Sequence, residues 1–71
     1  MPGEAEAERL MARSRRLLER MHEEDREEAI DLHERIEMAI ESGDTTTLAD
    51  ASRALTELLF FTEGQIGGLP N

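Results

Sequence analysis

Three stretches of the sequence repeat apolar residues at steps of three and four, the spacing of one face of an α-helix. In residues 4–21 the repeat consists of Leu10, Ser14, Leu17, Leu18 and Met21, with Met11 at its edge. In residues 24–42 it consists of Ala29, Leu32, His33, Ile36, Ala39 and Ile40. In residues 45–62 it consists of Leu48, Ala51, Leu55, Leu58, Leu59 and Thr62. The pattern predicts three helices and no strand between residues 8 and 60.

Two short breaks separate the predicted helices, one near Met21 to Asp25 and one near Gly43 to Thr45. Gly43 is suited to a helix C-cap with a positive φ, and Asp44 can accept hydrogen bonds from the free amides of the next helix. Short connections place consecutive helices antiparallel. We therefore expect an all-α fold, a small antiparallel three-helix bundle. An irregular tail is expected at residues 63–71, where EGQIGGLPN contains three glycines and one proline.

The composition limits the chain to one small domain, residues 1–71, with a modest core. There is no Cys, no apolar run long enough for a membrane span and no secretory signal, so a cytoplasmic location is expected. The net charge of -9, from 17 acidic and 8 basic residues, argues against nucleic acid and anionic membranes as partners. The basic residues gather in the first helix and the acidic ones in the second, which predicts that these two helices pair.

The sequence offers little that could perform catalysis or hold a metal. His33 and Glu37 are four residues apart on one helix, but no third ligand accompanies them. Ser14 and Ser52 have no His or Asp arranged for them in the sequence, and the acidic run EEDREE lacks the spacing of a calcium loop. Met11, Met21 and Met38 are expected to fill gaps in the core or at its boundary, with an adaptable binding surface as the alternative. We therefore expect no catalytic residue, no metal site, no cofactor and no enzymatic activity.

The two phenylalanines, Phe60 and Phe61, are the chain's only aromatic residues. At about 100° per residue, they lie to either side of a core stripe centred on Leu55, so both rings cannot face one core. Ile66 and Leu69 follow closely. We expect Phe60, Phe61, Ile66 and Leu69 to form a protein-contact surface, unless the tail folds back and covers the rings.

The order of these features resembles the C-terminal helical lid of the DnaK-type, seventy-kilodalton heat-shock chaperones. The resemblance covers residues 8–61 and rests on three segments, LMARSRRLLERM, HEEDREEAI and HERIEMAIESGDTTTLADASRALTELLF. Its best single match is the AIESGD corner followed by Leu48 and Ala51.

This resemblance implies a non-enzymatic lid module that helps a chaperone retain unfolded peptide by packing against protein. The contact would be with the chaperone's β-subdomain or with the peptide. The chain ends in GGLPN rather than in an EEVD-like tail, so co-chaperones that bind such tails are not implied. The alternative is a free-standing acidic homodimeric scaffold or interaction protein with no chaperone role.

Overall fold

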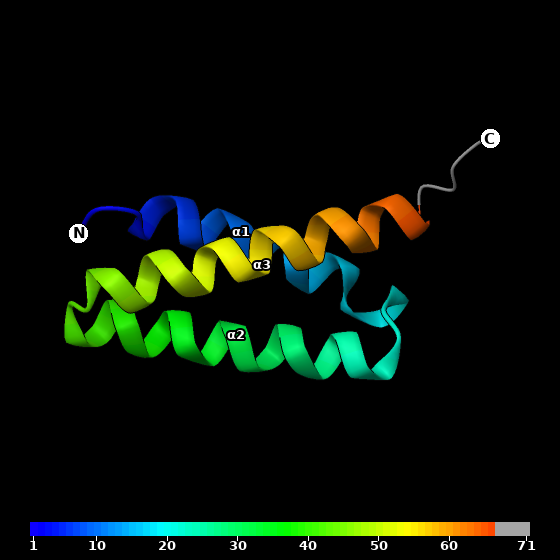
Figure 1. Ribbon diagram of the computed structural model, residues 1–71, viewed down its shortest axis with the longest axis horizontal. Coiled ribbons are helices and arrows are strands. Elements are labelled where there is room, and N and C mark those ends of the chain that lie inside the picture. The colour runs from blue at the N-terminus through cyan, green and yellow to red at the C-terminus, as the bar shows by residue number, and fades with distance from the viewer. Residues whose placement is uncertain (67–71) are drawn as a thin grey trace.

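The computed structural model describes residues 1–66, apart from the side chains of Gln65 and Ile66. Helix α1 spans Glu4–Leu17, a 3₁₀ turn η1 spans Leu18–Arg20, α2 spans Glu23–Ser42 and α3 spans Thr45–Ile66. In Figure 1 the chain runs from left to right along α1, back from right to left along α2 and from left to right again along α3, so α1 and α3 are parallel to each other and antiparallel to α2. The expected all-α three-helix bundle is confirmed, and residues 1–66 contain no strand.

The core is built mainly from the apolar faces of α2 and α3, closed on the third side by α1. Leu32, Ile36 and Ala39 of α2 are buried, as predicted. The predicted stripe of α3, from Leu48 to Thr62, is buried at all six positions. Four of the 15 buried residues within 1–66 come from α1 and the connection: Ala7, Met11, Ser14 and Met21.

The buried face of α1 is rotated relative to the prediction. Met11, which was placed at the edge of the stripe, is among the largest fully buried side chains, whereas Leu10 and Leu17 are only partly buried. Periodicity identified the helix correctly, but several neighbouring positions of α1 are apolar. Packing against two other helices selected the face centred on Ala7, Met11 and Ser14.

The first helix ends earlier than predicted, at Leu17 rather than at residue 21. The chain then tightens into η1, and Met21 is extended. The guanidinium of Arg26, from the first turns of α2, donates hydrogen bonds to the carbonyl oxygens of Leu18 and Met21, each at 3.2 Å. The Leu18 carbonyl oxygen also accepts from the Met21 amide, and together these bonds fix the course of the chain into α2.

The corner between α2 and α3 is formed as predicted. Gly43 has φ 73°, and the amides of Gly43 and Asp44 donate to the carbonyl oxygens of Ile40 and Ala39, the two bonds of a Schellman cap. Asp44 then caps α3: its Oδ1 accepts from the Thr47 amide at 3.0 Å and its Oδ2 from the Thr47 hydroxyl at 2.7 Å. These bonds to the charged carboxylate lower the pKa of Asp44.

The last helix is longer than predicted. It was expected to stop at Thr62, with an irregular tail from residue 63, but α3 continues through Gly64 to Ile66. A single glycine weakens a helix without ending it, because its φ and ψ can still be helical. Residues 67–71 lie outside the described part of the chain, so the irregular tail remains a prediction for them.

The prediction that the first two helices pair is confirmed, although charge accounts for little of their contact. The helices are neighbours, but the only ion pair between them within residues 1–66 joins Arg15 to Glu37 at 3.4 Å. Arg13 instead pairs with Glu63 on α3. Both pairs are largely exposed and contribute little to stability, so apolar burial rather than charge holds the helices together.

Candidate functional site

The last turns of α3 carry the largest exposed apolar side chains in residues 1–66. Phe60 is 81% exposed and Phe61 54% exposed. Their neighbours Leu58, Leu59 and Thr62 are buried and fill the core side of the helix. The prediction that both rings cannot face one core is therefore confirmed.

Gly64 lies between the two rings on the outer side of α3. It is four residues after Phe60 and three after Phe61, so all three positions share the outward side of the helix. A Cβ added at Gly64 would have no heavy atom within 4 Å. We call Phe60, Phe61 and Gly64 the Phe60–Phe61 surface: two rings flanking a position with no side chain, which allows a partner to approach the helix closely.

An ion pair ties this end of α3 to α1. The Arg13 guanidinium donates from Nε to Glu63 Oε2 at 2.9 Å and from Nη2 to Glu63 Oε1. The two bonds lower the pKa of Glu63 and raise that of Arg13. Because both side chains are substantially exposed, we assign the pair a role in orienting the helix end rather than a large stabilising one.

The other two predicted contact residues are not placed by the structure. Ile66 ends α3, but its side chain lies outside the described residues, and so does the whole of Leu69. The structure therefore brings Phe60 and Phe61 to one side of the bundle and leaves the roles of Ile66 and Leu69 as predictions.

A serine and a histidine meet between α1 and α2, which the sequence reasoning did not foresee. His33 Nε2 is 2.8 Å from Ser14 Oγ, and both residues are buried. Burial lowers the pKa of His33; Arg15 lowers it further, and Glu37 opposes both. The signal in the sequence was a serine and a histidine each standing within an apolar stripe. The Ser14 hydroxyl is fully enclosed, so it is not placed to attack a substrate. The pair is a polar contact within the core in which each group satisfies the other's hydrogen bond.

His33 and Glu37, which the sequence placed four residues apart as two candidate metal ligands, each contact a different side chain instead. His33 bonds to Ser14, while Glu37 faces Arg15 at the surface. Within residues 1–66 no group of three or more His, Cys, Asp or Glu side chains is arranged to hold a metal ion.

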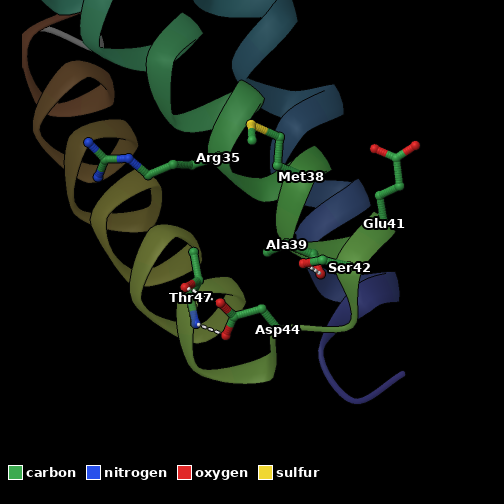
Figure 2. A pocket seen from close by; sticks show the side chains of 7 residues that line it. All are labelled: Arg35, Met38, Ala39, Glu41, Ser42, Asp44 and Thr47. Atoms are coloured by element: carbon green, nitrogen blue, oxygen red, sulfur yellow. Dashed lines mark hydrogen bonds between the residues drawn. The ribbon is translucent and has the colours of Figure 1, made fainter.

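An open hollow lies at the corner of α2 and α3 (Figure 2). The side chains that line it are Arg35, Met38, Ala39, Glu41, Ser42, Asp44 and Thr47. Met38 was expected in the core or at its boundary, but it is 67% exposed, because two residues beyond the buried Ile36 a helix turns about 200°. Figure 2 shows the Asp44 carboxylate bonded to Thr47, so one of the two acidic side chains of the hollow is already used by the helix cap.

Within the described residues, no helix combines the length and the apolar character needed to cross a lipid bilayer. No protein-family model matches the sequence, and no curated protein or solved structure matches it significantly. The similarity to the DnaK-type lid therefore stays a prediction that rests on the quoted segments.

Proposed function

We propose that this chain is a non-enzymatic protein-interaction module that binds apolar, unfolded polypeptide segments through the Phe60–Phe61 surface, in the manner of a chaperone lid. The observation that carries the proposal is the exposure of both rings, 81% and 54%, on a helix whose core side is already filled. Burying one phenylalanine contributes about 1.5 to 3 kcal/mol, so an apolar partner gains by covering them. The resemblance of residues 8–61 to the DnaK-type lid supplies the lid-like role and the kind of partner.

The test is binding to a soluble polypeptide that stays unfolded, such as reduced and carboxymethylated lactalbumin, followed by fluorescence anisotropy of the labelled polypeptide. Phe60→Ser and Phe61→Ser are each expected to weaken binding by about tenfold, since a loss of about 1.4 kcal/mol corresponds to that factor. Their helix content and melting temperature should stay close to those of the wild type, because the rings are exposed.

Met38→Ser is the matched control. It also removes a largely exposed apolar side chain, but from α2 and away from the Phe60–Phe61 surface. Binding that survives in Met38→Ser and weakens in both phenylalanine variants supports the proposal. A wild type that does not bind the polypeptide, or phenylalanine variants that bind as the wild type does, would refute it.

A further inference from the structure

A second surface, separate from the Phe60–Phe61 surface, lies where the outer sides of α1 and α2 run next to each other. The buried Ser14–His33 contact and the exposed Arg15–Glu37 pair place these two helices side by side. On α1 this surface presents Arg9, Ala12 and Arg16, all exposed. On α2 it presents Glu27, Ile30 and Glu34, also all exposed. We call these six residues the α1–α2 face.

The two halves of the α1–α2 face have the same spacing and opposite charge. In α1 a small apolar residue, Ala12, stands three residues after one arginine and four before the next. In α2 a large apolar residue, Ile30, stands three residues after one glutamate and four before the next. Residues at these steps share one side of a helix, and the charged positions in each half are about 10 Å apart along the axis.

The half on α1 is hollowed. An open hollow on α1 is lined by Glu6, Arg9, Leu10, Ala12, Arg13 and Arg16, so it includes all three α1 residues of the face. An occupant that suits it carries an apolar side chain between two carboxylates. In this chain Ile30, 42% exposed and flanked by Glu27 and Glu34, has that form.

We propose that the α1–α2 face is a contact between two copies of this chain, with α1 of one copy lying antiparallel against α2 of the other. Arg9 then faces the partner copy's Glu34, and Arg16 faces its Glu27. Ile30 of each copy lies over Ala12 of the other, in the gap between the arginines. A two-fold axis parallel to the helices repeats every contact, as a closed dimer requires.

The strength of the ion pairs across the face determines the affinity of the dimer. Exposed ion pairs are individually weak and are screened by salt, and two chains of net charge -9 repel each other. We therefore expect a dimer of modest affinity that needs the complementary face to form.

The experiment is sedimentation equilibrium of the wild type and of two charge-reversed variants. One variant carries Arg9→Glu with Arg16→Glu, and the other carries Glu27→Arg with Glu34→Arg. Each variant alone brings like charges together at the face and is expected to be a monomer. In an equimolar mixture both arrangements become complementary again, so the mixture is expected to sediment at twice the mass of one chain.

Arg53→Glu is the control, because it reverses an exposed arginine on α3 that lies outside the face. It is expected to dimerise as the wild type does, and so is Phe60→Ser. Circular dichroism establishes that each variant is folded before it is counted.

A wild type that stays monomeric at low salt and high concentration would overturn this proposal. It would also fail if the mixed variants do not associate, or if Phe60→Ser abolishes the dimer while the charge-reversed variants retain it. Because polypeptide binding is measured separately with the phenylalanine variants, the failure of one proposal is distinguishable from the failure of the other.

Discussion

Gly43 shows how a single residue directs this chain. Its φ of 73° lies in the left-handed region, where a Cβ is strained, although a Cβ added there would have no heavy atom within 4 Å. The cost of any other side chain at this position is therefore conformational and not a steric clash with the rest of the protein. That separation makes Gly43 a clean position at which to measure backbone strain.

We predict that Gly43→Val lowers the free energy of unfolding by about 1 to 2 kcal/mol, the cost of left-handed dihedrals for a residue with a Cβ. Thermal or urea unfolding followed by circular dichroism measures it. Gly64→Ala is the matched control: it too adds a Cβ into open space, but in a helical glycine without positive φ. It should stabilise the protein by about 0.5 to 1 kcal/mol. If both variants shift stability in the same direction, the left-handed cap is not what Gly43 contributes.

Among the helices, α1 is the one that contacts a neighbour through a buried polar pair, Ser14 with His33 of α2. The pairing of α2 with α3 follows from two well-marked apolar stripes joined by a tight corner. The position of α1 depends on a polar contact, because Ser14 and His33 meet within the buried interface of α1 and α2. A hydrogen bond between buried groups is costly to lose, so this pair favours one rotation of α1 over the alternatives.

We predict that the packing of α1 on α2 weakens as the pH falls. Burial lowers the pKa of His33 in the folded protein, so below about pH 6.5 the unfolded chain binds more protons than the folded one. The stability that neutral His33 contributes is present above about pH 6.5 and is lost progressively as the pH decreases towards the folded pKa. Unfolding free energies measured from about pH 7.5 down to about pH 5 should therefore decline.

His33→Gln isolates this effect, because glutamine can bond to Ser14 and carries no charge at any pH. Its unfolding free energy should decline less than that of the wild type over the same range. The second histidine, His22, is present in both proteins, so it does not affect the difference. Equal slopes for the two proteins would remove His33 as the cause.

In the molecule as a whole, most of the acidic side chains have no basic partner in an ion pair within residues 1–66. The chain has 17 acidic and 8 basic residues, and residues 1–66 form three ion pairs, none of them enclosed. Self-repulsion of this kind destabilises a compact state, and salt screens it. The net effect of salt on the folded monomer should therefore be stabilising.

We predict that the melting temperature rises by about 2 to 5 °C between about 10 mM and about 0.2 M NaCl. The measurement uses dilute protein, so that any self-association does not contribute. Repeating it with KCl separates charge screening from ion-specific effects. A melting temperature that falls with salt would mean that Arg13–Glu63 and Arg15–Glu37 outweigh the repulsion, contrary to their exposure.

Local information in the chain was enough for the three helices, the corner at Gly43 and Asp44, and the buried stripes of α2 and α3. Each of these depends on residues within about one helical turn of one another, so it can be read from spacing and capping alone. The outward position of Phe60 and Phe61 followed for the same reason, since their angle to Leu55 is a property of one helix.

Only the packing of the helices decided the rest. Packing set the rotation of α1 that buries Met11. It also brought together two pairs that are distant in the sequence: Ser14 and His33, 19 positions apart, and Arg13 and Glu63, 50 positions apart. The early end of α1, held by Arg26, and the continuation of α3 through Gly64 also depend on neighbours or on weak local preferences. Several rotations of an amphipathic helix about its axis bury a similar apolar area. The periodicity of one helix therefore does not determine which residues of the other helices it contacts, and this is decided only when all three helices pack together.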